Sequence, residues 1–403
     1  MLLQLASVVG HVSYLRRHYR PFVARPSATA PPAEPAVAVS MPATLPWGQT
    51  PTVSVIIPCK NSGATIRATA EALLGQDYPA LEQVILVGDI DDPTWTALDG
   101  LDDPRLIILE QEPTPGRRDP NVKRDKGIRK ASGDLLALAD SDIVMDRGWL
   151  GRAVALLQQQ DGGLVAGGMR SIDDSFWGRF VDRNALAAKT PRLPVPYQVT
   201  AENFGRRGYK PPITANAVFT SKLYDACPLD IHWPFGYEDY EWFWRLARDG
   251  HRILFTDQLT AAHRHRRSYA ALTREYRQAA YGCAQYVRAH PDSPLARKRR
   301  RQALLLPLAA VTGLAVTSVT VIDGFGLAVA ALAVVAALTV AAAEVRRSRS
   351  LEGVAYAMAG LGLGVVFASS LITALLRRPP VFGTGSPPAR SHGRTAQSHV
   401  RLR

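Results

Sequence analysis

Three long stretches in the C-terminal part of the chain contain no charged residue, and they limit its possible folds more than any other feature. They run from 303 to 321, from 325 to 343 and from 354 to 375. Each is long enough to cross the hydrocarbon core of a bilayer as a helix. Buried helices of a soluble protein are the alternative, but such helices normally keep a polar face. The stretches therefore predict transmembrane helices within residues 297–376.

Basic residues flank these stretches and predict their orientation. Residues 297–301 form an unbroken basic run before the first stretch, and three arginines lie between the second and the third, within 346–349. Because positive loops stay inside, both groups are expected in the cytoplasm, together with everything before residue 297. Three spans would put the basic tail outside, so either the Gly-rich third stretch is re-entrant or the tail is an exception. We expect a multi-pass protein of the cell membrane.

The charge of the chain is unevenly distributed. Its 403 residues include 48 Lys and Arg against 35 Asp and Glu, a formal net charge of +13. Such a balance suits nucleic acid, an anionic membrane or anionic substrates. However, residues 297–403 hold 14 of the basic residues and only three acids, a net of +11, which leaves +2 for residues 1–296. We therefore expect membrane lipids as partners and no nucleic acid, with residues 377–403 as a basic disordered tail.

Residues 1–50 are predicted to be an N-terminal segment followed by a Pro/Ala-rich linker. The apolar part, 1–15, is short and lacks a leading basic region, so a secretory signal is not expected and an interfacial helix is the alternative. The cysteines Cys59, Cys227 and Cys283 are scattered along the chain. They exclude a disulfide framework or a cysteine-based zinc site and suit a reducing compartment.

From Pro51 onward, short apolar runs alternate with helical patterns. Val53–Pro58 is a continuous β-branched run, typical of a strand covered on both faces, and a helix is predicted over 64–74. The further predicted elements are strands at 84–87, 106–109 and 134–139 and a helix at 122–131. This alternation predicts an α/β fold with a mainly parallel sheet over 51–296. Ligands of such sheets bind at the carboxyl ends of the strands.

Two carboxylates, one residue apart, follow the last of these strands. Asp140 and Asp142 would be released at the strand end. There they can supply hard oxygen ligands to Mg²⁺ or Mn²⁺ while the metal holds a diphosphate. Alone the pattern is weak, because an Asp-x-Asp in a loop is more often a solvated turn.

Three motifs in a specific order give this pattern its context. They are Val-Ser-Val-Ile-Ile-Pro-Cys-Lys-Asn at 53–61, Ala-Ser-Gly-Asp-Leu-Leu-Ala-Leu-Ala-Asp-Ser-Asp at 131–142 and Phe-Gly-Tyr-Glu-Asp-Tyr-Glu at 235–241. Together they resemble the family 2 glycosyltransferases with a GT-A fold, over about residues 51–285. The resemblance implies a Rossmann-like domain, a nucleotide-sugar donor such as a UDP- or GDP-sugar, and a divalent cation, Mg²⁺ or Mn²⁺.

The resemblance also implies roles for individual residues. Asp239, preceded by Glu238, matches the catalytic base. Asp140 matches an acid that contacts the ribose or the metal, Asp142 matches a metal ligand, and His263 matches a histidine that reaches the metal or the diphosphate. The residues expected to line the nucleotide pocket are Pro58, Lys60, Asn61, Asp89, Arg124 and Asp140.

Some of these roles have alternatives. Glu238 and Asp239 open a predicted helix, 240–248, and could simply favour its dipole. The basic run that contains His263 and His265 could contact phosphate or lipid headgroups instead of a metal, although imidazole among carboxylates suits Mn²⁺.

The acceptor side is expected around Thr214–Ala217, which resembles the family's acceptor-side loop. Arg206, Arg207 and Lys210 precede it and could meet a lipid phosphate or form a solvated loop. The aromatic side chains within 240–244 could stack on sugars, but we expect at least two of them to pack in the core.

The chain also departs from the family pattern. It has Gly88-Asp89-Ile90-Asp91-Asp92 where the family usually has Asp-Asp-Gly-Ser. Which of these acids contacts the base of the nucleotide therefore stays open. Asp125 replaces an asparagine at the helix start. The Gln-x-x-Arg-Trp signature of processive synthases is missing, which indicates transfer of a single sugar rather than polymerisation.

These features predict an inverting, metal-dependent glycosyltransferase that moves a single sugar to a lipid-linked or cell-envelope glycan acceptor at the cytoplasmic membrane face. A carboxylate would remove the acceptor proton while the metal neutralises charge on the leaving diphosphate. A catalytically inactive GT-A scaffold in the membrane is the alternative. It would be expected to lose Asp142 or Asp239, and both are present.

Overall fold

The computed structural model describes residues 50–113, 119–184, 196–206, 208–233, 236–305, 326–377 and 400–401. These residues fall into two compact units. Of the described residues, the sheet unit contains 50–173, 196–265 and 400–401, and the helical unit contains 174–184, 266–305 and 326–377. Helix Tyr269–Ala289 lies inside the predicted 51–296 domain but groups with the helical unit, because its apolar side chains pack on a C-terminal helix.

The sheet unit contains one mixed sheet with the strand order β10-β3-β2-β1-β4-β8-β6-β9-β5, with β7 paired to β9. The strands are β1 (Val53–Pro58), β2 (Leu81–Asp89), β3 (Leu106–Gln111), β4 (Leu135–Ala139), β5 (Ile143–Val144), β6 (Leu164–Ser171), β7 (Tyr197–Gln198), β8 (Asn216–Thr220), β9 (Ile253–His263) and β10 (Val400–Arg401).

Most of the long strands run in one direction. β3, β2, β1 and β4 are parallel to their neighbours, and β6 is parallel to β9. β8 is antiparallel to both β4 and β6, so it reverses between two halves that share a direction. The predicted α/β class with a mostly parallel sheet is confirmed, and the sheet is mixed because of β8 and the short strands.

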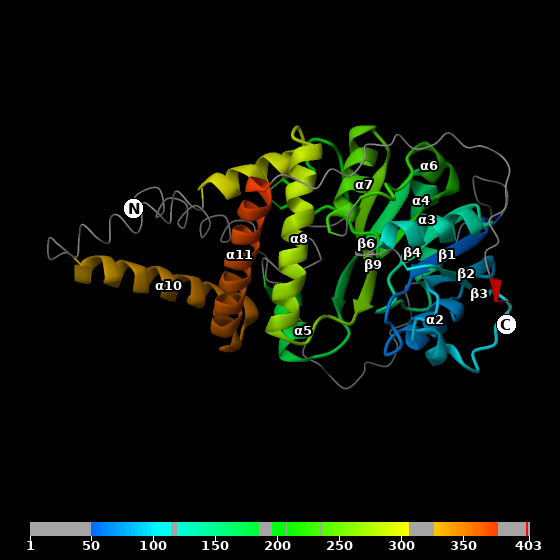
Figure 1. Ribbon diagram of the computed structural model, residues 1–403, viewed down its shortest axis with the longest axis horizontal. Coiled ribbons are helices and arrows are strands. Elements are labelled where there is room, and N and C mark those ends of the chain that lie inside the picture. Colours follow the sequence, from blue (N-terminus) through cyan, green and yellow to red (C-terminus); the bar gives the residue numbers. More distant parts are fainter. Residues whose placement is uncertain are drawn as a thin grey trace. The chain divides into compact units, whose positions relative to one another are not determined.

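Helices cover both faces of this sheet. The helices are α2 (Ile66–Leu74), α3 (Pro120–Lys130), α4 (Trp149–Gln159), α6 (Ser221–Ala226) and α7 (Glu238–Arg248). Val55 and Ile57 share a core with Ile66 of α2, whereas Ile56 points the other way, against Gly127 of α3. Accordingly, α2 and α3 lie on opposite sides of β1 and β2 (Figure 1). Because both faces of β1 are buried, nearly all of its residues are apolar.

The parallel register brings three loops to one edge of the sheet. Pro58 of β1 pairs with Val87 of β2, and Ile56 pairs with Leu138 of β4. The residues that follow these strands therefore leave the sheet side by side, as the carboxyl ends of parallel strands do. A 2.6 Å hydrogen bond between the Ser62 and Ser141 hydroxyls ties the first loop to the third.

The helical unit contains α5 (Phe176–Arg183), α8 (Tyr269–Ala289), α10 (Gly326–Ser348) and α11 (Glu352–Leu376). α11 packs against α8 and α10. Its apolar core includes Phe180 of α5, Leu272 of α8, and Tyr356 and Leu363 of α11. Arg179 of α5 forms a 2.6 Å ion pair with Glu352 at the start of α11.

One helix in the described part of the chain, α11, is long and apolar enough to cross a membrane. Only 22% of its most apolar window is buried, which is unlike the core helix of a soluble protein. α11 contains the third predicted stretch and α10 contains all but the first residue of the second. The first stretch lies outside the described residues from 306 onward, as do residues 1–49 and most of the tail.

Gly133 provides a test of how closely β4 packs beside β1. A Cβ at this position would lie 2.6 Å from the Ser54 nitrogen and 2.9 Å from the Val53 carbonyl carbon, and backbone atoms cannot rotate away. We expect Gly133→Ala to lower the free energy of unfolding by about 1–3 kcal/mol, measured from thermal unfolding followed by circular dichroism.

The matched control is Gly151→Ala on α4, where an added Cβ meets nothing within 4 Å. Alanine favours a helix over glycine by roughly 0.8–1.0 kcal/mol, so this variant should unfold at an equal or higher temperature. Equal stability of the two variants would contradict the close approach of the strands.

Candidate active site

A buried arginine joins the Asp-Ser-Asp loop to the start of α7. Arg124 of α3 has a side chain only 5% exposed, and its Nη2 atom lies 3.1 Å from Oδ1 of Asp140. Its Nη1 atom lies 3.8 Å from Oδ1 of Asp239 and donates a 3.2 Å hydrogen bond to Asn121. A buried guanidinium needs such partners, because desolvation of an unpaired charge is costly. Three residues predicted from separate motifs therefore meet at one point.

Asp239 and Glu238 begin α7 but point into different surroundings. The chain enters the helix through Gly236 and Tyr237, both with positive φ. Oε2 of Glu238 accepts a 2.7 Å hydrogen bond from the Gly236 N–H, and this residue is only 8% exposed. Asp239 keeps 23% of its side chain exposed, and its Oδ1 accepts a 2.5 Å hydrogen bond from the Thr214 hydroxyl. Of the two acids, Asp239 is the one that solvent and a substrate can reach.

Both carboxyl groups hold protons more tightly than usual. Burial raises the pKa of Asp239, Asp140 adds to this effect, and Arg124 and Thr214 oppose it. Burial together with the charge of Asp239 raises the pKa of Glu238 from 4.5 to about 7. Perturbed carboxyl groups of this kind are common where proton transfer occurs.

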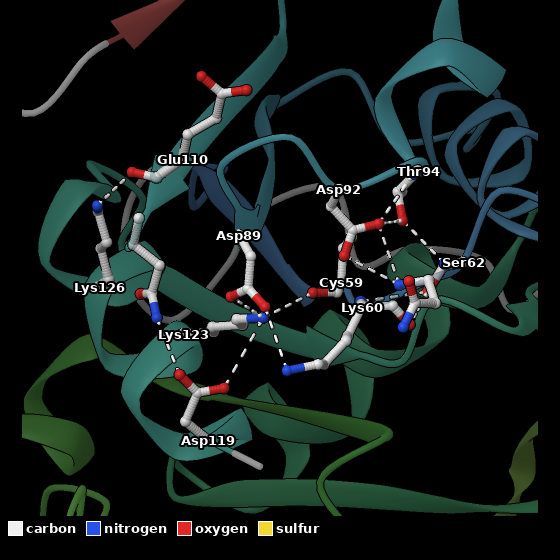
Figure 2. Close-up of polar contacts among 12 residues, drawn as sticks. Cys59, Lys60, Ser62, Asp89, Asp92, Thr94, Glu110, Asp119, Lys123 and Lys126 are labelled. Carbon is white, nitrogen blue, oxygen red and sulfur yellow. Dashed lines mark hydrogen bonds and ion pairs between the residues drawn. The ribbon is translucent and has the colours of Figure 1, made fainter. Parts of the chain in front are cut away.

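The carboxyl end of β2 carries an acid between two lysines. Oδ1 of Asp89 lies 2.6 Å from Nζ of Lys123 on α3, and Oδ2 lies 3.2 Å from Nζ of Lys60. Figure 2 shows both lysines directed at the carboxylate of Asp89. The predicted pocket residues Lys60 and Asp89 are thus brought together.

The loop after β1 is fixed by the next acid along the chain. Pro58 ends β1, and Asn61 adopts a left-handed conformation with φ 52°. Both carboxylate oxygens of Asp92 accept the Asn61 N–H, at 2.9 and 3.0 Å. Burial opposes ionisation of Asp92, but hydrogen bonds from Thr94 and from the Asn61 N–H outweigh it and lower its pKa.

The structure therefore separates the acids that the sequence left open. Asp89 faces Lys60 at the strand end, Asp92 holds the backbone of the first loop, and Asp91 is exposed. Of the three acids, Asp89 is the one paired with lysines at the end of β2.

Asp142 and His263 lie together where β5 pairs with β9. Ile143 is opposite His263 in the ladder, and the Arg264 N–H donates to the Asp142 carbonyl. Nε2 of His263 lies 3.3 Å from Oδ1 of Asp142, and its Nδ1 lies 2.8 Å from Nδ1 of His265.

Among the described residues, no group of three His, Cys, Asp or Glu side chains has an arrangement that could hold a metal ion. Asp140 is paired with Arg124 rather than grouped with Asp142 and His263. One carboxylate and one imidazole nevertheless fit a Mg²⁺ or Mn²⁺ ion whose remaining ligands come from a bound diphosphate and water.

The segment Thr214–Ala217, which the resemblance predicted on the acceptor side, contributes one residue to this site and buries another. Thr214 contacts Asp239, as described above. Asn216 is fully buried and accepts a 2.9 Å hydrogen bond from the Trp149 indole, while its amide donates to the Gly168 carbonyl at 3.1 Å. Asn216 thus holds the loop and does not face a ligand.

The remaining predicted residues lie away from these acids or have structural contacts. Arg206 is exposed, Arg207 lies outside the described residues, and the Lys210 carbonyl accepts a 2.8 Å hydrogen bond from Tyr197. Trp242, Phe243 and Trp244 are buried and Tyr240 is half-buried, so the prediction that at least two of these aromatics pack in the core is confirmed.

Two contacts at the site were not predicted from the sequence. Lys123 had no assigned role, although a lysine beside Arg124 on a helix that covers a sheet is a visible signal. The hydrogen bond from Thr214 to Asp239 joins residues far apart in sequence and had no local signal.

Comparisons with known proteins find similar sequences and a shared fold. Residues 54–227 match the family described as Glycosyl transferase family 2. "Glycosyltransferase AglE" of Haloferax volcanii is 32% identical over 136 residues, which cover 32% of this chain and 40% of that protein. "UDP-Glc:alpha-D-GlcNAc-diphosphoundecaprenol beta-1,3-glucosyltransferase WfaP" of Escherichia coli is 32% identical over 90 residues, 22% of this chain and 35% of that protein. The chain thus matches no more than two fifths of the length of these relatives.

A solved structure shares the fold. The mannosyltransferase PcManGT from Pyrobaculum calidifontis, in complex with GDP-Man and Mn²⁺, is 20% identical and aligns with a TM-score of 0.56 over 90% of this chain and 97% of that one. Residues 54–227 are thus similar to the Glycosyl transferase family 2, and the chain shares its fold with this mannosyltransferase.

The raised pKa of Glu238 makes stability depend on pH. The carboxyl group ionises near 4.5 in its ordinary state and near 7 in the folded chain. The stabilisation it gives is present below pH 4.5 and is lost as the pH rises through 7. We expect Glu238→Gln to raise the free energy of unfolding at about pH 8, on the order of 1–3 kcal/mol, and to change it little near pH 4.5.

Thermal unfolding at both pH values checks this prediction, with Glu71→Gln on α2 as the control. Glu71 is exposed and pairs only with Arg67 in the contacts seen here, so its replacement should have little effect on stability at either pH. If Glu238→Gln were less stable than wild type at pH 8, the prediction would be wrong, because the surrounding groups would then stabilise the ionised Glu238 carboxylate.

Proposed function

We propose that the chain transfers a single sugar, with inversion, from a nucleoside-diphosphate sugar to a hydroxyl group of a lipid-linked or cell-envelope glycan. The observation that carries this proposal is the meeting of Asp239, Arg124 and Asp140 at the carboxyl edge of the sheet. These residues come from three different elements, and Asp239 remains partly exposed and so open to an acceptor.

Asp239 is the proposed base. The Thr214 hydroxyl and Arg124 both contact its Oδ1 atom, so the carboxylate has a defined orientation. It takes the proton from the acceptor hydroxyl as the acceptor oxygen attacks the anomeric carbon. The bond between the anomeric carbon and the diphosphate oxygen breaks on the opposite face, so the nucleoside diphosphate leaves and the configuration of the sugar is inverted. Glu238, turned toward Gly236, supports the start of α7.

The donor would lie across the ends of β1, β2 and β4. Pro58, Lys60, Asn61 and Asp89 are proposed to line the nucleotide pocket, and Asp140, held by Arg124, is proposed to face the ribose. WfaP is named for UDP-Glc, and PcManGT was solved in complex with GDP-Man, which supports a UDP- or GDP-sugar as the donor. The WfaP name also includes a diphosphoundecaprenol acceptor, which supports the lipid-linked class.

Asp142 and His263 are proposed to hold Mg²⁺ or Mn²⁺, with Asp140 nearby on the same loop. When bound, the ion would neutralise negative charge on the leaving diphosphate. The Mn²⁺ of the PcManGT complex supports this assignment.

An inactive scaffold is the alternative class. It would have no need to keep Asp239 oriented by Thr214 or Asp142 beside His263, and the chain keeps both arrangements. The missing signature of processive synthases supports single transfer over polymerisation.

We propose further that residues 51–296 contain the catalytic region and that the apolar stretches within 297–376 anchor it as a multi-pass membrane protein. The apolar, largely exposed surface of α11 supports membrane contact. The basic groups at 297–301 and 346–349 support a catalytic region on the cytoplasmic side.

The decisive experiment incubates the full-length protein, in membranes or detergent, with UDP-, GDP- and dTDP-sugars, Mn²⁺ and lipid-linked acceptors, and measures nucleotide release. We expect turnover of a donor by wild type and a fall of about 10²–10⁴-fold in kcat for Asp239→Asn, because general base catalysis is lost. Asp77→Asn, which removes an exposed carboxylate paired with Arg147, should retain wild-type turnover. Equal rates for Asp239→Asn and wild type would rule out Asp239 as the base.

Membrane attachment is checked by extraction of the full-length protein. We expect it to stay in the membrane pellet after high salt and alkaline carbonate and to dissolve only in detergent, because apolar helices hold it by hydrocarbon contact. In sealed inside-out vesicles, added protease should cleave the catalytic region, and in right-side-out vesicles it should not. Release by carbonate, or cleavage in right-side-out vesicles only, would contradict the anchor or its orientation.

A further inference from the structure

The buried lysine behind the proposed nucleotide pocket has no part in the mechanism described above. Lys123 lies on α3 with a side chain only 2% exposed. Its Nζ atom lies 2.6 Å from Oδ1 of Asp89, donates a 3.0 Å hydrogen bond to the Cys59 carbonyl, and lies 3.8 Å from Oδ1 of Asp119 (Figure 2). The ammonium group is thus enclosed by oxygens from β1, β2 and the start of α3.

Stability alone gives a weak reason for a charge in this position. Burying an ion pair carries a desolvation cost, and apolar residues of similar size often stabilise a fold as well or better. Such apolar packing occurs one turn further along the same helix, where Ile56 and Val87 pack directly against Gly127 of α3. A lysine at 123 is therefore better explained by what it does to Asp89.

The two lysines around Asp89 differ in exposure and so in role. Lys123 is enclosed and holds Oδ1 from inside the protein, whereas the Lys60 side chain is 42% exposed and reaches Oδ2 from the solvent side. The backbone of Asp89 is also held, because its carbonyl accepts a 3.1 Å hydrogen bond from the Trp95 indole. The carboxylate is anchored on one oxygen and presents the other beside a partly exposed cation.

A second acid keeps Lys123 itself in place. Asp119 approaches the ammonium from the side opposite Asp89, and its Oδ2 accepts a 3.0 Å hydrogen bond from Gln111 of β3. Rotation of the lysine away from Asp89 would give up its contacts to the Cys59 carbonyl and to Asp119 as well. The orientation of the Asp89 carboxylate is therefore built into the core of the sheet unit.

We infer that Lys123 is a positioning residue for the nucleotide of the donor: it fixes Asp89 so that Oδ2 accepts a hydrogen bond from an N–H group of the base of a nucleoside diphosphate. This inference rests on the proposed function. An ionised carboxylate only accepts hydrogen bonds, so the recognised group must be a donor on the base edge. Lys123 itself touches no substrate.

The test measures binding and turnover separately. Full-length protein in detergent is titrated calorimetrically with UDP, GDP and dTDP, and the tightest ligand serves as the probe; KM and kcat are then measured with the matching sugar donor. We expect Lys123→Met to raise Kd and KM by about tenfold to a hundredfold, the range for a charge-assisted hydrogen bond, with little change in kcat. Lys126→Met is the matched control, because Lys126 lies on the same helix and contacts only the Glu110 carbonyl among the contacts seen here.

A double-mutant cycle shows whether Lys123 acts through Asp89. In an Asp89→Asn background, Lys123→Met should cause no further rise in Kd, because the group that it positions is already changed. If Lys123→Met alone fails to fold, the double variant, which removes both charges, is compared directly with Asp89→Asn. Equal Kd values for these two support the inference, and a further rise of tenfold or more overturns it.

The outcomes also separate this inference from the proposed function. If wild type binds a nucleotide and turns over its sugar while Lys123→Met matches wild type in Kd and KM, the positioning role is wrong and the proposed function stands. If wild type binds none of the nucleotides and releases none from any donor, both are wrong.

Discussion

The buried guanidinium of Arg124 links the parts of the proposed active site. Its side chain is almost completely enclosed, and it pairs with Asp140 after β4 and Asp239 at the start of α7. A charge in this position is tolerated only if acids neutralise it, and acids so close together are tolerated only if a cation separates them. The three groups therefore depend on one another. The β4 loop, the start of α3 and the start of α7 must take up their positions together for any of them to be stable.

The sheet supplies the frame for this arrangement. Parallel pairing of β1, β2 and β4 brings their carboxyl ends to one edge, and helices on both faces hold the register by burying alternate side chains. Close backbone approaches, such as that of Gly133 to β1, leave little room for the strands to shift. Short polar contacts, such as the Ser62–Ser141 hydrogen bond, then set the loops against each other.

The acids at the carboxyl edge of the sheet share one arrangement. Each acid that is proposed to meet a substrate has a buried or half-buried partner that orients it: Lys123 for Asp89, Arg124 for Asp140, and Thr214 for Asp239. Glu238 shows the cost of gathering so many acids, because burial and the charge of Asp239 raise its pKa to about 7. Pre-oriented groups of this kind favour a charged transition state because they need little rearrangement during the reaction.

Much of the fold could be predicted from the sequence because the relevant signals are local. The apolar run of β1, its bounds, and the helix–strand alternation follow from side-chain periodicity, and β1 was predicted to the residue. The acids of the Asp-Ser-Asp and Glu-Asp motifs could be selected as site candidates from residue order. The apolar character of α11 was equally visible, because a long run without charges needs no tertiary context to be recognised.

Only the tertiary structure decided which of these residues meet and which way they face. Asp92 is distinguished from Asp89 and Asp91 because it accepts the hydrogen bond from the Asn61 backbone. Asn216 is a buried support because its side chain accepts a hydrogen bond from the Trp149 indole. The antiparallel insertion of β8 and the grouping of α8 with α11 depend on contacts between distant segments. Lys123 gained its position in the same way. Sequence determines which chemical groups are available and which elements carry them, whereas their pairing depends on long-range packing that no local pattern records.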